Sequence, residues 1–143
     1  MVTKALASAS NEIVQSSLEG LTGKSAEEVV DNVITIYKKT IGENPDFFSF
    51  LFEMWCVARR SKKIKREFAS CQDRVVSAIK ERLENASEQG IIKINLSEAE
   101  ALARILLAIS DGTAFHMINH QEKLNDKKTW MPLRRMMLSV LNE

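Results

Sequence analysis

One segment of the sequence, residues 98–121, restricts the fold more than any other, because it has the pattern of a long helix without a water-facing side. Between Ala99 and Ile109 only Glu100 and Arg104 are charged, and the apolar side chains lie around the whole helical circumference. A surface helix carries one apolar stripe, whereas a helix that is apolar all round is buried on several sides. Such a helix is either the central post of a bundle or is shared between its own core and a second copy of the chain. We favour the second arrangement.

The composition is that of an ordinary soluble protein rich in helix. Apolar residues make up 45% and charged residues 27%, and five Gly and two Pro leave little turn chemistry for a many-stranded sheet. We expect residues 1–143 to form a single domain. We also expect it to be cytoplasmic, because Cys56 and Cys71 lack CxxC spacing and are interpreted as reduced thiols. The start of the chain lacks a signal-peptide pattern, and no stretch is expected to reach the roughly 20 apolar residues of a membrane span. The net charge of +1 excludes a general basic field for nucleic acid.

Apolar periodicity predicts an all-α fold of six helices, at about residues 4–18, 25–41, 45–59, 61–89, 97–120 and 127–142. Ser25 with Glu28, and Ser97 with Glu100, have the spacing of capping boxes at two helix starts. Residues 91–96 are predicted to be a loop. The run FFSFLFEMWCVA in the third helix carries large apolar side chains on two sides, so this helix should be buried on more than one side.

The order of these features resembles a known family. The chain has a helix entered by Asn-Pro-Asp and ending in FEMWCVARR, a long amphipathic helix ending in SEQG, an apolar helix containing ILLAISDGTAF, and a closing amphipathic helix. This succession is similar to the ligand-binding and dimerisation domain of tetracycline-repressor (TetR) family transcriptional regulators. The resemblance implies a six-helix orthogonal bundle that forms a homodimer through a four-helix bundle. It also implies a small apolar or amphipathic effector that controls DNA binding in the full-length protein.

The family's helix-turn-helix, whose recognition helix enters the DNA major groove, has no counterpart here. The chain therefore looks like the effector half alone, whether by truncation or as a natural short form. We expect no specific nucleic-acid binding by this chain and no membrane partner. Repressor and activator both remain open.

Two sets of residues are candidates for the sites. The aromatic run of the third helix favours filled core on composition alone, but the resemblance favours a ligand cavity there. The predicted ligand-binding residues are Phe50, Met54, Trp55, Cys71, Gln72, Val75, Ile109 and Gly112. The predicted dimer interface, on the last two helices, consists of Ile105, Ala108, Phe115, Leu133, Met136, Met137 and Val140.

Other chemistry is weaker. His116 and His120 are four residues apart, as two metal ligands would be, but no third ligand is evident, so polar helix-end residues are the favoured interpretation. The segment RRSKKIKR, residues 59–66, is more typical of a solvated helix junction than of a phosphate-binding site. No catalytic constellation, metal site or cofactor motif is found, and we expect no enzyme. The main alternative function is a helical protein–protein interaction module with a solid core and no ligand.

Overall fold

The computed structural model describes residues 4, 8, 11–12, 14–15 and 18–142, and it is all-helical. Two short 3-10 turns, Leu96–Glu98 and Gln121–Lys123, flank the fourth of its five long helices. Within the described residues there is no strand, only an isolated bridge between Lys93 and Asn142. The long helices are α2 (Ala26–Glu43), α3 (Pro45–Ala58), α4 (Lys62–Glu88), α5 (Ala99–Ile118) and α6 (Lys127–Leu141).

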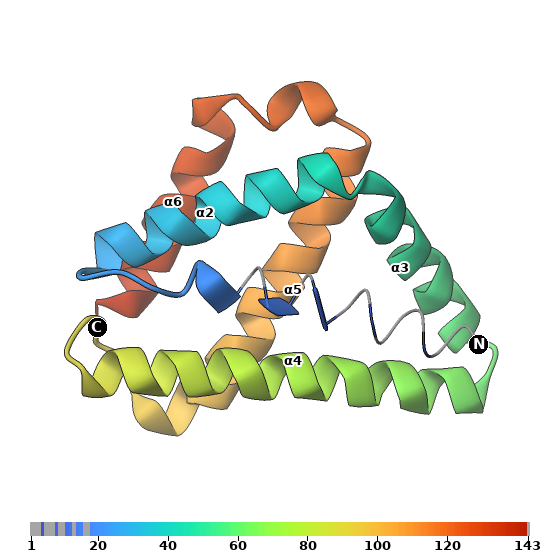
Figure 1. The fold of residues 1–143 in the computed structure, drawn as a ribbon, viewed down its shortest axis with the longest axis horizontal. Coiled ribbons are helices and arrows are strands. Elements are labelled where there is room, and N and C mark those ends of the chain that lie inside the picture. Colours follow the sequence, from blue (N-terminus) through green and yellow to red (C-terminus); the bar gives the residue numbers. More distant parts are fainter. Residues whose placement is uncertain (1–3, 5–7, 9–10, 13, 16–17, 143) are drawn as a thin grey trace.

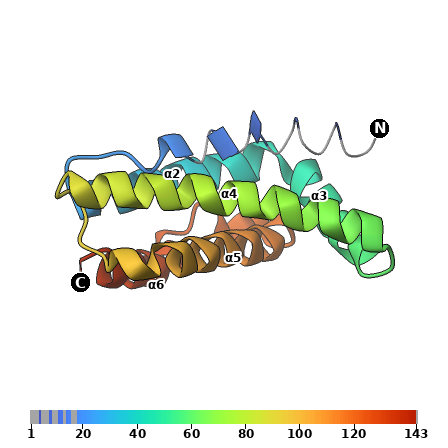
Figure 2. The same ribbon diagram turned by 90° about the horizontal axis from the view of Figure 1, so that it is seen from below.

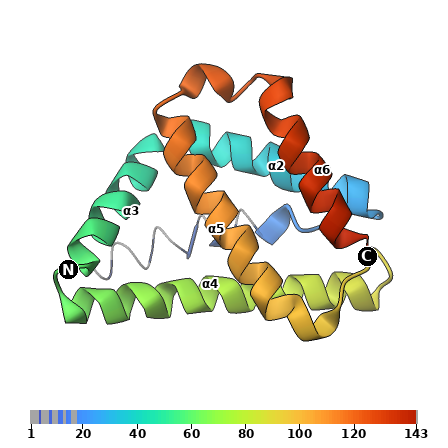
Figure 3. The same cartoon turned by 180° about the vertical axis from the view of Figure 1, so that it is seen from behind.

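Helices α2, α3 and α4 lie along the sides of a triangle, and α5 crosses it from the end of α4 towards the junction of α2 and α3 (Figure 1). Helix α5 packs against α4, α3 and α2, and α6 packs against α2. Seen from below, α5 and α6 form one outer layer on the same side of α4 (Figure 2). Seen from behind, both helices lie in front of the triangle (Figure 3). Helix α5 therefore packs on three helices along one side but is exposed along the other, so the expectation that it lacks a water-facing side is wrong for a single protomer.

Local capping explains where the helices begin. The Ser25 hydroxyl accepts a hydrogen bond from the Glu28 amide at 3.2 Å, and the Glu28 carboxylate accepts one from the Lys24 amide at 2.9 Å. These bonds satisfy amides that a helix start leaves without partners. The capping box predicted at Ser97 is wrong, because Asn95 accepts from the Ser97 amide at 3.1 Å and caps a 3-10 turn ahead of α5.

The core joins all five long helices. Side chains that are almost fully buried come from α2, α4 and α6, among them Val30, Ile41, Leu83 and Leu141. Burial of each contributes roughly 1.5–3 kcal/mol relative to an exposed side chain. The Lys93 amide donates to the Leu141 carbonyl at 2.8 Å, so the connection between α4 and α5 is fixed to the end of α6.

The all-α prediction is confirmed, and the predicted helices from residue 25 onward match within a few residues. The predicted first helix, 4–18, falls largely on residues outside the description, although its described residues are helical. The six-helix count and the TetR-like bundle therefore stay predictions. By length and composition, Leu96–Ile118 is apolar enough to cross a membrane, which the sequence analysis did not anticipate. Its apolar character also suits a helix packed on three neighbours.

Candidate functional site

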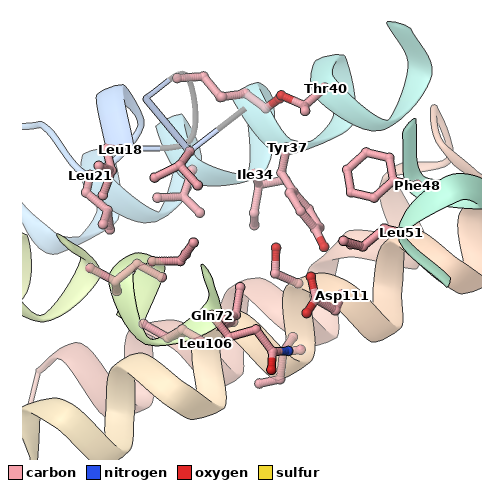
Figure 4. Close-up of a pocket in the computed structure, with 18 of the residues that line it drawn as sticks. Leu18, Leu21, Ile34, Tyr37, Thr40, Phe48, Leu51, Gln72, Leu106 and Asp111 are labelled. Atoms are coloured by element: carbon pink, nitrogen blue, oxygen red, sulfur yellow. The ribbon is translucent and has the colours of Figure 1, made fainter. Parts of the chain in front are cut away.

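A cavity of about 180 Å³ lies inside the triangle of helices, between α2, α3, α4, α5 and α6. Val14 and Leu18, ahead of α2, also line it. Figure 4 shows side chains from these elements pointing into the same space. Most of the lining is aliphatic or aromatic, and the wall of α3 consists of Phe47, Phe48 and Leu51. Ligand sites in proteins are typically apolar cavities of this kind with a few placed polar groups.

The polar groups of the cavity come from α2, α4 and α5. They are Tyr37, Thr40, Gln72, Ser110 and Asp111, and Cys71 adds a thiol. Among them, the Thr40 hydroxyl donates to the Ile36 carbonyl at 2.8 Å, which occupies its proton within α2. The others are free to face the cavity.

Tyr37 and Asp111 are the most perturbed of these groups. The Tyr37 hydroxyl is buried and has no hydrogen-bond partner among the described residues. Burial raises the pKa of Tyr37, the Ser110 side chain and the Ala114 backbone partly oppose this rise, and the nearby Asp111 charge adds to it. Burial alone raises the pKa of Asp111 to about 6. Figure 4 shows the Tyr37 hydroxyl and the Asp111 carboxyl oxygens directed towards the same part of the cavity. An apolar cavity with an ionisable pair at one end can orient an amphipathic molecule.

The structure brings together part of the predicted ligand-binding set. Cys71, Gln72, Val75 and Ile109 line the cavity. The remaining four, Phe50, Met54, Trp55 and Gly112, do not belong to its lining. Whether any of these residues binds a ligand stays a prediction.

Position along α3 explains much of the difference, because only the first half of this helix borders the cavity. Met54 packs with Phe68 and with the half-buried Phe50 in a small separate cluster at the α3–α4 junction. Trp55 is 59% exposed, although the sequence predicted burial on both apolar sides of this helix. The cavity wall is formed by Phe47, Phe48 and Leu51 from the first two turns of α3, before the helix reaches Met54 and Trp55.

The predicted interface residues divide between two faces. Ile105 and Phe115 of α5, and Met136 of α6, are more than half exposed, Val140 is 38% exposed, and Ala108 is also exposed. We call these residues the outer apolar face. Leu133 and Met137 instead point inward and line the cavity. Together with Trp130 and Leu141 they form the buried side of α6, because these residues are three or four positions apart. Side chains on this buried side cannot also belong to the outer apolar face.

Gly112 lies on the exposed side of α5, one turn from Ala108. A Cβ added there would meet nothing within 4 Å, so the protomer itself does not require a glycine at this position. Close approach of a ligand inside the cavity is also not the reason, because Gly112 is absent from the lining.

Among the described residues, the weaker candidates gain neither a third metal ligand nor a disulfide partner. The rings of His116 and His120 are 4.6 Å apart, and within the described chain no group of three residues suited to a metal ion is found. Cys56 is exposed and Cys71 lines the cavity, and both are free thiols. The basic residues of 59–66 are exposed around the turn between α3 and α4.

Comparison of the chain with protein-family models, with curated proteins and with solved structures finds no match. The interpretation of the site therefore depends on its geometry. Sequence reasoning missed Tyr37 and Asp111 as cavity residues. A signal for Asp111 was present, because it is the one acidic residue between Ala101 and Ile118 of an otherwise apolar helix.

Proposed function

We propose that this chain is an effector-binding and dimerisation domain of a TetR-like transcriptional regulator. In this proposal a small amphipathic molecule occupies the cavity and changes the DNA binding of a full-length protein, and this chain alone binds no specific DNA sequence. The observation that carries the proposal is the cavity itself, because close packing is the rule in protein cores. Its lining draws on α2, α3, α4, α5 and α6, so an occupant could influence their relative positions.

The proposed homodimer uses the outer apolar face. Exposed Ile105, Phe115 and Met136 lie on two helices that form one layer, and an uncovered face of this kind is typical of an association surface (Figures 2 and 3). A two-fold axis beside α5 and α6 would build a four-helix interface from two copies. A Cβ added at the exposed Gly112 would meet nothing within 4 Å, which leaves space for close approach of a partner.

The same face favours the alternative function of a protein–protein interaction module. In that case the outer apolar face would bind another protein, and the cavity would be a packing defect without a ligand. The two functions differ in what the cavity does. They can therefore be separated by experiments on the cavity rather than on the surface.

The test combines ligand screening with a variant that fills the cavity. Thermal-shift measurements with small apolar and amphipathic compounds should identify stabilising ligands, and a ligand at 100 times its dissociation constant adds about 2.7 kcal/mol. Val75→Phe adds a bulky side chain to the lining and should abolish that stabilisation. Ala69→Phe, on an exposed position of the same helix, is the matched control and should leave it intact.

The result against the proposal is equally clear. If no compound stabilises the wild type, or if Val75→Phe and Ala69→Phe bind equally well, the cavity is not a ligand site. The interaction-module function would then be the better account. Flotation with vesicles tests whether the apolar helix α5 binds a membrane. Co-migration of the protein with lipid would identify the outer apolar face as a membrane-binding surface.

A further inference from the structure

Among the described residues, the lining of the cavity contains one carboxylic acid and no basic side chain. Asp111 is its one carboxylate, and no lysine, arginine or histidine occurs among the described lining residues. The residues outside the description include no such side chain either. The basic side chains that form salt bridges in the described chain pair with other partners, as Arg104 does with Asp73 and Glu100. Asp111 is therefore a largely buried carboxyl group that has no salt-bridge partner among the described residues.

The groups that face Asp111 are neutral. Tyr37 approaches from α2 with a buried hydroxyl, and Ser110 precedes Asp111 on α5. Gln72 and Cys71 face the cavity from α4, and the other walls are apolar. Burying a carboxylate in such surroundings is costly unless it is paired, and burial accordingly raises the pKa of Asp111 to about 6.

We propose that the ligand of this cavity is a compact organic cation, with a single-ring or short aliphatic body and a protonated amine that pairs with the Asp111 carboxylate. This inference rests on the proposed effector-binding function and specifies its ligand class. The apolar walls receive the body, and the Tyr37 hydroxyl lies beside the charged group. An ion pair formed in a water-poor cavity is favourable when both charges find hydrogen-bonding partners.

The size of the cavity limits the body of the ligand. An apolar cavity of about 150 Å³ in another protein holds a benzene molecule. A cavity of about 180 Å³ therefore suits one ring with a short chain, and a larger polycyclic compound would exceed this volume. A carboxylate ligand would meet the Asp111 charge, and a neutral ligand would leave that charge unpaired. Cations are thus favoured over both.

Three matched probes test the charge preference at pH 7.5. They are 4-phenylbutylamine, 4-phenylbutan-1-ol and 4-phenylbutanoate, which share one body and differ in the terminal group. Calorimetric titration of the wild type should give the amine at least a tenfold lower dissociation constant than the alcohol, with the carboxylate weakest. Asp111→Asn should bring the amine and the alcohol to within about threefold of each other. Glu53→Gln, which removes an exposed carboxylate from α3, should leave the ranking unchanged.

A pH series on the wild type gives a second readout that does not depend on the folding of a variant. The amine stays protonated between pH 5 and 7.5, whereas Asp111 becomes neutral as the pH falls through about 6. No histidine, the side chain that ordinarily titrates in this range, occurs among the described lining residues. Amine affinity should fall at low pH, and alcohol affinity should not.

The failures of the two proposals are distinguishable. If the alcohol or the carboxylate binds as well as the amine, or if Asp111→Asn keeps the amine preference, the cavity binds ligands but the cation inference is wrong. If none of the three probes binds the wild type and wider screening also fails, the effector-binding function falls with it. Amine binding that survives in Val75→Phe would place the amine outside the cavity and also contradict the inference.

Discussion

Arg134 of α6 and Asp31 of α2 form a two-pronged ion pair across 103 residues of chain. The Arg134 guanidinium donates through Nε to Asp31 Oδ1 at 2.6 Å and through its Nη2 group to Oδ2 at 3.0 Å. The hydrogen bonds and the positive charge of Arg134 hold the pKa of Asp31 below its ordinary value. The pair fixes the last helix against the first fully described one.

Asp31→Asn should lower the free energy of unfolding by about 0.5–1 kcal/mol at neutral pH, because the pair is bidentate but solvent-exposed. The pKa of Asp31 is lower in the folded state than in the unfolded state. The ion pair therefore stabilises the fold above the unfolded-state pKa of 3.8, and this stabilisation is lost as the pH falls through the folded-state pKa. Urea denaturation at pH 7 and pH 2.5 checks this. The difference between wild type and variant should be smaller at the lower pH.

The control for this prediction is Asp73→Asn. Arg104 loses one partner in that variant but keeps Glu100, which accepts from its Nη2 group at 3.1 Å, so a smaller change is expected. Equal losses in both variants would contradict the special role of the Arg134–Asp31 pair.

Asp111→Asn should stabilise the ligand-free protein at pH 7.5. Burial raises the folded-state pKa of Asp111 from 3.8 to about 6, so ionisation destabilises the fold as the pH rises between these values. The shift corresponds to about 3 kcal/mol as an upper figure, since one pKa unit is about 1.4 kcal/mol. The melting temperature of the variant should exceed that of the wild type at pH 7.5 and approach it at pH 4. A variant less stable than the wild type at pH 7.5 would mean that the carboxylate has a partner in the free protein.

Gly90→Ala should cost about 1 kcal/mol of stability. Gly90 has φ of 71° at the end of α4, a left-handed conformation that a Cβ disfavours. Gly112→Ala is the matched comparison, because this glycine is helical with open space around it, and it should gain up to about 1 kcal/mol in the monomer. Chemical denaturation measures both. Changes of the same sign would show that backbone conformation is not the deciding difference.

Ala108→Glu should convert a homodimer to a monomer, because it places a charge in the middle of the outer apolar face. Light scattering across micromolar concentrations measures the mass, which is 16.2 kDa for one chain. Ala69→Glu, at an exposed position of α4 outside that face, should leave the mass unchanged. A wild type that is monomeric throughout the range would contradict the dimer proposal.

The helices were accessible from sequence because their signals are local. The Ser25 cap, the apolar spacing of α4 and Gly90 at its end all act within a few residues, and the structure has each as expected. The wrong prediction of a cap at Ser97 also has a local cause, because the Asn95 side chain, two residues earlier, caps the chain instead.

The cavity was only partly accessible because its position depends on how helices rotate against one another. Periodicity identified two apolar sides on α3 but could not say which would face α4 and which the interior. In the structure, Met54 packs against Phe68 of α4, so this side of α3 faces α4. Tyr37 and Asp111 are distant in sequence and meet only through the crossing of α2 and α5. No pattern within either helix encodes that meeting.

Helix α5 has its cavity side at Leu106 and Ser110 and its outer side at Ile105 and Ala108, within one rigid element. If a ligand and a second copy both bind, a displacement of α5 that favours binding of one also changes the affinity for the other. Thermodynamic linkage then requires each to change the affinity of the other by the same factor. The apparent dissociation constant of a ligand would therefore vary with protein concentration. Titrations at nanomolar and at high micromolar protein would give different values, and their ratio would measure the coupling across a single helix.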